Sequence, residues 1–287
     1  MLRLPRRSVL VSILAAPMLV HSRSSLAALP PGKSDQRLAV NGTELFVFFY
    51  MPAGGAEKLL VTCHGSERHP STQVDAALSL AEATRSLIVA PYFDTKRFPE
   101  SAYQWGGLNR GVGHRTVDLI QPLVDQVRER AGAALPCYMI GHSAGGQFLQ
   151  KVAAFASGDA REIVAANPGA QLMPSANEPY PYGYKTLRSR GGTEAGLQRY
   201  LAARLTLYQG TADTRQDEGF PRGEYAERQG ASRYARGLNC FAAGKKFAEV
   251  KGWEFGWRLI EASGIGHSSK GMYTHHNAVN AVFGRGA

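Results

Sequence analysis

Short runs of apolar residues recur along the chain and alternate with amphipathic segments. Several runs are continuously apolar, which is typical of strands covered on both faces. Strands that alternate with helices predict an α/β fold with three layers and a mostly parallel central sheet. The expected strands are Glu44–Tyr50, Lys58–Cys63, Leu87–Tyr92, Leu135–Ile140, Glu162–Ala166, Arg204–Gln209 and Glu254–Ala262. The expected helices are Thr72–Arg85, Arg115–Arg130, Gln147–Ala156, Tyr225–Ala242 and Tyr273–Val282.

The segment 170–200 interrupts this alternation. It contains prolines, glycines and a tyrosine cluster that includes Tyr180 and Tyr182, and it has no helical period before Glu194. We expect a short, cap-like insertion at the C-terminal edge of the sheet, over the active site, because open α/β sheets bind ligands at that edge. The tyrosines either line a substrate cleft or pack the loop against itself, and the sequence favours neither.

Residues 1–29 have the pattern of an export signal. Arg6-Arg7 precedes an apolar stretch, Val9–Val20, that is too short to span a bilayer. Ser25-Leu26-Ala27 then supplies a small-x-small cleavage pattern. We expect a leader of the twin-arginine type and a periplasmic or secreted protein without stable membrane insertion. Residues 30–287 fit one domain. An uncleaved amphipathic tail or membrane anchor is the alternative.

Composition and charge narrow the class of protein. The chain of 287 residues is 44% hydrophobic and 20% charged, which is ordinary for a protein with a sizeable core. The first 29 residues hold four arginines and no acid, so the formal net charge falls from +10 to +6 without them. The chain has no block of lysine and arginine and no alternation of basic with aromatic residues, so we do not expect nucleic-acid binding.

The 3 cysteines are Cys63, Cys137 and Cys240. Cys63 and Cys137 lie in strand-like runs and are expected to be small core residues. A single disulfide that involves Cys240 is possible after export. No Cys/His spacing indicates a metal site, and we expect neither a metal nor an organic cofactor.

The stretch Gly141-His142-Ser143-Ala144-Gly145-Gly146 contains a G-x-S-x-G sequence. A strand is expected just before it and a helix just after it, which is the context of a nucleophile elbow. In such a turn the serine hydroxyl is exposed at the tip. The sequence therefore predicts Ser143 as a nucleophile.

A serine hydroxyl needs a base, and the base needs a third group to orient it. Asp213 and His267 each follow an expected strand, and they give the chain order Ser…Asp…His. We expect His267 to be the base and Asp213 to orient it. Asp217 is the rival acid, and an Asp that only forms a turn is the alternative for Asp213.

An oxyanion hole needs two N–H donors aimed at the developing negative charge. Ala144 follows the nucleophile, and Ser66 lies in the loop after the strand Lys58–Cys63, so their amides are the expected donors. We expect His64 to orient this loop rather than act as a catalyst. We also predict that His64, Tyr180 and Tyr182 belong to the substrate-binding part of the site.

The chain resembles α/β-hydrolases from about Lys58 to about Ser268. Within that superfamily it is similar to exported bacterial hydrolases related to polyhydroxyalkanoate depolymerases and carboxylesterases. An HGGG-type loop and an appended substrate-binding domain are absent from the sequence, so neither a lipase nor attack on solid polymer is supported. The stretches that carry the resemblance are Cys63-His64-Gly65 with Arg68, Ala90–Asp94, Gly141–Gly146, Asn167-Pro168-Gly169, Pro181-Tyr182-Gly183, Gly210–Asp213, Gln229-Gly230 with Arg233 and Arg236, and Gly266-His267-Ser268.

The resemblance implies a serine hydrolase that cleaves a small or oligomeric carboxylic ester through an acyl-enzyme on Ser143. The same residues would also serve a peptidase, an amidase or an acyltransferase, because one fold and one triad support many chemistries. A catalytically silent hydrolase fold used for binding is the alternative from another class. The acyl and alcohol specificity and the oligomeric state do not follow from the sequence.

Overall fold

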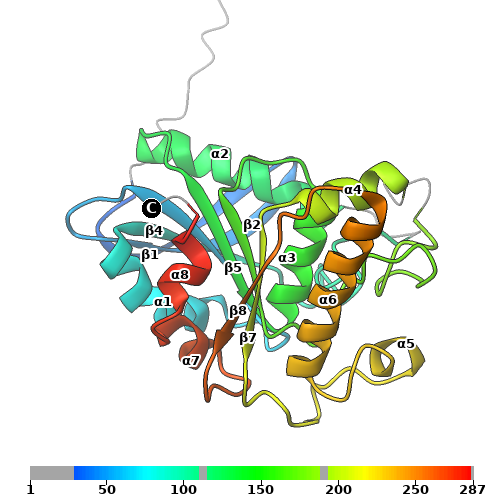
Figure 1. Ribbon diagram of the computed structural model, residues 1–287. Coiled ribbons are helices and arrows are strands. Elements are labelled where there is room, and N and C mark those ends of the chain that lie inside the picture. Colours follow the sequence, from blue (N-terminus) through cyan, green and yellow to red (C-terminus); the bar gives the residue numbers. More distant parts are fainter. Residues whose placement is uncertain (1–28, 110–114, 188–192, 286–287) are drawn as a thin grey trace, which may run out of the picture.

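The computed structural model describes residues 29–109, 115–187 and 193–285. Within them an eight-stranded sheet has the order β1-β2-β4-β3-β5-β6-β7-β8 (Figure 1). β1 and β2 pair antiparallel, β2 pairs antiparallel with β4, and every later pairing is parallel. The predicted α/β class and mostly parallel sheet are therefore confirmed. The strands are β1 (Gly32–Val40), β2 (Thr43–Met51), β3 (Lys58–Cys63), β4 (Ser86–Tyr92), β5 (Cys137–His142), β6 (Glu162–Ala166), β7 (Leu205–Gly210) and β8 (Arg258–Ala262).

Helices cover both faces of the sheet and form the outer two layers. One face packs against α1 (Pro70–Thr84), α7 (Ser269–Thr274) and α8 (Ala278–Phe283), which share one cluster of buried side chains. The other face packs against the turn η1 (Thr116–Leu119) and four helices (Figure 1). Those four are α2 (Ile120–Ala131), α3 (Ala144–Phe155), α4 (Glu194–Ala202) and α6 (Arg233–Lys251). A short helix, α5 (Glu224–Glu227), precedes α6.

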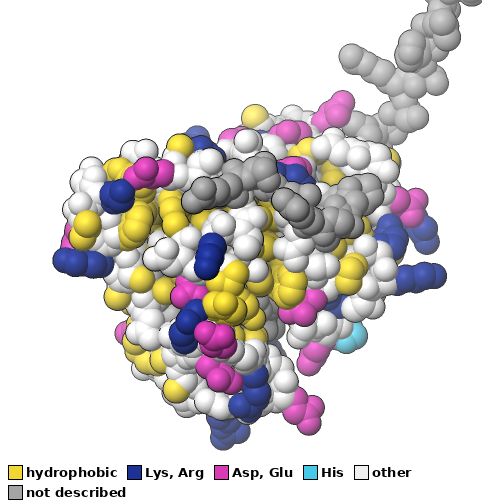
Figure 2. Space-filling model, turned by 90° about the vertical axis from the view of Figure 1, so that its right-hand side faces the viewer, with side chains coloured by type: hydrophobic (Ala, Val, Ile, Leu, Met, Phe, Trp, Pro, Cys, Tyr) yellow, Lys and Arg dark blue, Asp and Glu magenta, His cyan; other side chains and the backbone are white. Residues whose placement is uncertain are grey.

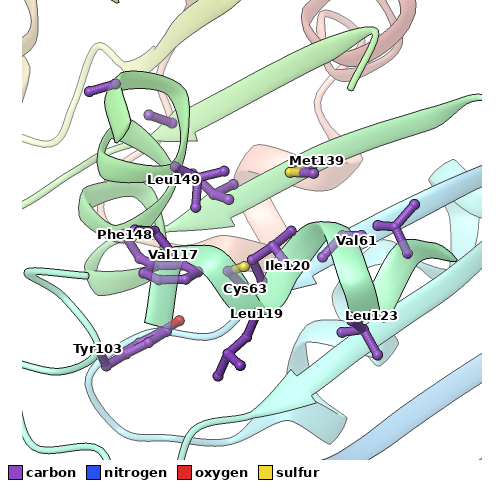
Figure 3. Close-up of a cluster of buried hydrophobic side chains, with 14 of the residues drawn as sticks. Val61, Cys63, Tyr103, Val117, Leu119, Ile120, Leu123, Met139, Phe148 and Leu149 are labelled. Carbon is purple, nitrogen blue, oxygen red and sulfur yellow. The ribbon is translucent and has the colours of Figure 1, made fainter. Parts of the chain in front are cut away.

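The central strands are buried on both faces, as their continuous apolar runs predict. Along β3, Leu59, Val61 and Cys63 belong to the cluster on the α2 and α3 side, whereas Leu60 belongs to the cluster under α1. Figure 3 shows Val61 and Cys63 beside Leu123 of α2 and Phe148 of α3. This double burial fixes the strands, so that residues just beyond their carboxyl ends are held on a rigid frame.

The first strand was not expected from the sequence. β1 has the sequence GKSDQRLAV and lies at the edge of the sheet, where exposed side chains alternate with half-buried ones and, from Leu38, with buried ones. It joins β2 through Asn41-Gly42, both with positive φ (47° and 74°), which is a common two-residue hairpin turn. The central strands were recognised by their apolar runs. β1 has no such run before Leu38, which explains why the sequence did not predict it as a strand.

Helix boundaries differ from the expectation where glycine or polar residues break a helix. The expected helix Tyr225–Ala242 is two helices, α5 and α6, separated by Gly230 with φ 147°. The expected helix Tyr273–Val282 is likewise divided into α7 and α8. α4 begins at Glu194, where the sequence first shows a helical period.

The described part of segment 170–200 is ordered and packs beside the sheet. Leu172, Tyr180, Tyr184 and Leu187 all belong to the hydrophobic core on the α3 and α6 side. The Leu172 N–H donates to Oε1 of Gln150 on α3 at 2.8 Å. None of the described residues of this segment lines the pocket at Ser143. The described part of the segment therefore does not form the expected cap over the active site.

The predicted leader, residues 1–29, lies outside the described residues except for Leu29. That residue is only 7% exposed and packs in the hydrophobic core, so the folded part of the chain extends at least one residue beyond the expected boundary. No helix in the described ranges is long and apolar enough to cross a bilayer.

All 3 cysteines are buried free thiols, so Cys240 forms no disulfide with Cys63 or Cys137. Burial raises the pKa of the Cys240 thiol to about 12. A neutral buried thiol behaves as a small hydrophobic side chain, which is the role expected of Cys63 and Cys137.

Charged side chains are spread over the surface. On the face that carries α4 and α6, Lys and Arg side chains lie among Asp and Glu side chains and small hydrophobic areas (Figure 2). This view shows no single-sign field on that face.

Candidate active site

Ser143 lies at a sharp turn between β5 and α3. Its backbone has φ 57° and ψ −117°, a conformation that non-glycine residues rarely adopt. The turn is held by the Ser143 N–H, which donates to the carbonyl of Ala166 at 2.9 Å. Sharp strand-to-helix turns of this kind expose the serine hydroxyl above the edge of the sheet.

Glycines allow the turn to pack closely against its neighbours. A Cβ atom on Gly145 would lie 2.2 Å from the carbonyl oxygen of Cys63, at the end of β3. A Cβ on Gly141 would lie 2.5 Å from the carbonyl oxygen of Gly145. Both contacts are with backbone, which cannot move aside as a flexible side chain can.

We expect Gly145→Ala to lower the free energy of unfolding by about 3 kcal/mol, because the new methyl group must displace the end of β3. Urea denaturation measures this loss. Gly54→Ala is the control, because a Cβ there meets nothing within 4 Å and the residue has no positive φ. Equal stability of the two variants would contradict the close packing.

The structure brings the three sequence-predicted residues together. His267 Nε2 lies 3.0 Å from Ser143 Oγ, and His267 Nδ1 lies 2.7 Å from Asp213 Oδ2. Asp213 follows β7 and is 2% exposed, and His267 follows β8 in a loop that turns at Gly264 with φ 73°. Three strand ends therefore place a hydroxyl, an imidazole and a carboxylate in one line.

Asn167 was not singled out as a site residue, although it follows β6 directly. Its Oδ1 accepts from the Gly210 N–H at 2.7 Å, and its Nδ2 donates to the Gly266 carbonyl at 3.1 Å. One buried amide thus joins the loop before Asp213 to the loop that carries His267. The only sequence signal was its position at a strand end.

Asp217, the rival acid, has a different partner. Arg233 at the start of α6 donates to its two carboxylate oxygens at 2.9 and 2.6 Å. These hydrogen bonds lower the pKa of Asp217. Arg233 is 1% exposed, and its Nη1 also lies 3.6 Å from Asp213 Oδ1. The buried guanidinium compensates the buried Asp213 charge, a contact that the sequence did not indicate.

His142 packs against the imidazole of His267, with ring centroids 4.5 Å apart. It is buried, and burial is the main reason that its pKa lies well below the ordinary value. A neutral ring in this position can support the orientation of His267 without adding a second positive charge.

The expected oxyanion donors lie beside Ser143. A Cβ built on Gly65 would be 3.8 Å from Ser143 Cβ, so the Gly65-Ser66 backbone runs along the serine. Ser66 is exposed and lines the pocket. Ala144 is the first residue of α3, and the first N–H groups of a helix have no partner within it.

His64 is a structural residue and does not line the pocket. It is fully buried, its Nε2 accepts from the Phe93 N–H at 3.1 Å, and its Nδ1 lies 3.0 Å from the Gly65 carbonyl. Both ring nitrogens are therefore engaged by backbone. This corrects its placement on the substrate-binding side and agrees with the expectation that it orients the loop.

Protonation of His64 gives stability a defined pH dependence. Burial lowers the pKa of His64 from 6.5 to about 4. The unfolded chain therefore takes up this proton at higher pH than the folded chain. The stability that the neutral His64 contributes is fully present above the pKa of the unfolded chain. About 3 kcal/mol of the free energy of unfolding is lost as the pH falls towards the pKa of the folded chain. We expect the free energy of unfolding to fall less between about pH 7.5 and about pH 5 in His64→Gln than in the wild type. Urea titrations measure the difference, and parallel falls would contradict it.

Tyr180 and Tyr182 do not line the pocket either. Tyr180 is buried in the core, and its hydroxyl donates to the Trp105 carbonyl. Tyr182 stacks on Tyr225 with ring centroids 6.1 Å apart. The tyrosines therefore pack the segment against neighbouring parts of the protein and do not line the cleft at Ser143.

A pocket of about 640 Å³ opens at Ser143 and His267. Four parts of the chain line it. The first comprises residues 65–67, 69 and 72–73, and the second comprises residues 142–143. The third comprises residues 217–219 with 233, and the fourth comprises residues 267–270. In the described ranges, no group of three or more His, Cys, Asp or Glu side chains is arranged to hold a metal ion.

No model of a protein family matches the chain, and no curated protein matches it. Solved structures do. Poly(aspartic acid) hydrolase-1 from Sphingomonas sp. KT-1 is 31% identical, with a TM-score of 0.79 over 85% of this chain and 96% of that one. LpqC, a poly(3-hydroxybutyrate) depolymerase from Bordetella parapertussis, is 29% identical, with a TM-score of 0.79 over 88% of this chain and 90% of that one. An S-formylglutathione hydrolase from Agrobacterium tumefaciens shares the fold, with 15% identity and a TM-score of 0.52 over 84% of this chain and 90% of that one.

Proposed function

The chain belongs to the α/β-hydrolase superfamily, and from that membership we propose that it is a serine hydrolase that cleaves carboxylic esters through an acyl-enzyme on Ser143. The observation that carries the proposal is the line of contacts from Asp213 through His267 to Ser143, at 2.7 and 3.0 Å, with the serine on a strained turn. These distances are those of a nucleophile, a base and an orienting acid.

In the proposed reaction His267 is neutral, with its Nδ1–H donating to Asp213 and its Nε2 accepting from the Ser143 hydroxyl. Ser143 Oγ attacks the ester carbonyl while His267 takes the hydroxyl proton. His267 then gives that proton to the leaving alcohol, and an acyl-serine ester remains. A water molecule attacks this ester by the same route, with His267 again as the base, and releases the acid and the free enzyme.

The tetrahedral oxyanion forms twice in this sequence, on attack by serine and on attack by water. The Ser66 and Ala144 amides are the proposed donors to it. One such donor is worth about 3 kcal/mol of transition-state stabilisation. Arg233 and Asn167 do not react in this scheme and instead hold Asp213 and the His267 loop in place.

A fluorophosphonate probe and a para-nitrophenyl ester test the proposal. We expect the probe to add one phosphonyl group to Ser143, detected by peptide mass spectrometry, and to abolish ester hydrolysis. We also expect a burst of nitrophenol that matches the enzyme concentration. Well-folded protein that is neither labelled nor active on any ester would overturn the proposal. Hydrolysis of the para-nitroanilides of the same acids, measured beside the esters, distinguishes amidase activity from esterase activity.

We further propose that the protein is exported and that its leader is removed close to the buried Leu29. Cell fractionation and N-terminal sequencing of the mature protein test this. Replacement of Arg6 and Arg7 by lysine should retain the precursor inside the cell. A mature protein that still starts at Met1 in the exported fraction would contradict the cleavage.

A further inference from the structure

The pocket at Ser143 has a wall without hydrophobic side chains. Among the described residues, each side chain in its four lining segments carries nitrogen or oxygen, or the residue is glycine. Pockets for small molecules are usually lined mostly by hydrophobic and aromatic groups. At about 640 Å³ the cavity is also far larger than an acetyl group requires. Its polarity is therefore a property of the substrate site as a whole and not of the catalytic residues alone.

A polar wall changes what an alkyl chain can gain. A methylene group that moves from water to an apolar wall strengthens binding by about fourfold. Against Gln73 or Ser269 the same methylene would meet only short methylene stems and would displace water from polar atoms, which offsets most of that gain. Extension of an acyl chain into this pocket should therefore bring little gain in kcat/KM.

The wall keeps hydrogen-bonding capacity that no described residue uses. Gln73 of α1 and Ser269 of α7 meet across the pocket, with Gln73 Nε2 donating weakly to Ser269 Oγ at 3.5 Å. Gln73 Oε1 is buried and accepts no hydrogen bond from the described residues. A buried acceptor without a partner is costly, so a donor on a bound substrate would satisfy it after a small rotation of the amide.

Carboxylates outnumber cations around the pocket. Arg233 is shared by Asp217 and Asp213, and the exposed carboxylates of Glu67 and Glu218 face only the ammonium of Lys270. This excess disfavours an anionic substrate. Uncharged polar groups fit the wall best.

We propose, on the premise of the ester-hydrolase reaction above, that this site selects small polar esters whose acyl or alcohol part carries hydroxyl or amide groups that donate hydrogen bonds. Specificity comes from hydrogen bonds to the wall formed by α1 and α7, and alkyl length contributes little.

Two para-nitrophenyl esters of equal length test the proposal. The butanoate and the 3-hydroxypropanoate differ by a hydroxyl group, which can donate to Gln73 Oε1, in place of the terminal methyl group, and division by the hydroxide-catalysed rate constants removes their different reactivity. We expect the normalised kcat/KM of the 3-hydroxypropanoate to be about tenfold higher, as for one hydrogen bond gained. We expect the butanoate, hexanoate and octanoate to agree within about twofold.

Gln73→Leu adds an apolar patch to the wall and should remove most of the preference for the 3-hydroxypropanoate, chiefly through KM. Gln198→Leu, an exposed position on α4, is the matched control and should keep it. Ester hydrolysis that depends on Ser143 but rises about fourfold with each methylene would overturn the polar selectivity and leave the proposed function standing. No Ser143-dependent hydrolysis of any ester would overturn both.

Discussion

Ser143→Ala is expected to lower kcat for ester hydrolysis by about 10⁶-fold while the fold and its stability are kept. The methyl group cannot form the acyl-enzyme. Without the hydroxyl, His267 has no serine proton to accept, and the orientation of His267 by Asp213 no longer activates a nucleophile. Residual turnover would come only from water held near the oxyanion donors. Because alanine accepts the same backbone as serine, we expect the turn at φ 57° and ψ −117° to persist.

Single-turnover and steady-state kinetics with a para-nitrophenyl ester measure this loss, and the nitrophenol burst should vanish with it. Ser263→Ala is the control, since Ser263 is an exposed serine in the same β8-to-His267 connection and should retain wild-type kinetics. Activity of Ser143→Ala above about one hundredth of the wild type would place the nucleophile elsewhere.

The three aligned side chains could be predicted because each follows a strand of the parallel sheet. Parallel strands end at one edge, so Ser143, Asp213 and His267 had to be near one another once the strands were located. The local sequence carries this information, since β5 and β7 are short, mostly apolar runs and β5, β7 and β8 are each followed by small residues. The geometry of 2.7 and 3.0 Å needed the three-dimensional structure.

Roles that depend on tertiary contacts could not be predicted. Arg233 is an ordinary helix residue in the sequence, and its contact with Asp213 exists only because α6 begins beside the end of β7. Tyr180 and Tyr182 show the converse. A tyrosine cluster in a loop has the same composition whether it lines a cleft or packs against α3, and only the structure distinguishes the two.

The polarity of the pocket was hidden for a related reason. Its wall is assembled from the starts of α1 and α7 and the loop that precedes α5, which are far apart in the sequence. Each stretch alone is an unremarkable polar loop or helix start. Their meeting around Ser143 converts three ordinary surface segments into one specificity element.

Asp213→Asn is expected to lower kcat by about 10⁴-fold, whereas Asp217→Asn should stay within about tenfold of the wild type. The amide that replaces the Asp213 carboxylate can no longer hold His267 as the Nδ1–H tautomer or stabilise its protonated form. Nε2 of His267 then carries the proton and cannot accept the proton of Ser143. Asp217 touches Arg233 and not His267, and Arg233 keeps its contact with Asp213 when Asp217 is neutral.

Both variants are measured on one ester across pH, with circular dichroism to establish that each is folded. The structure predicts the ranking from contacts alone, because each carboxylate has a distinct partner at hydrogen-bond distance. Asp213 is buried and meets the imidazole, and Asp217 is half exposed and meets the guanidinium. The reverse ranking would mean that the loop after β7 rearranges when substrate binds and delivers Asp217 to His267 in its place.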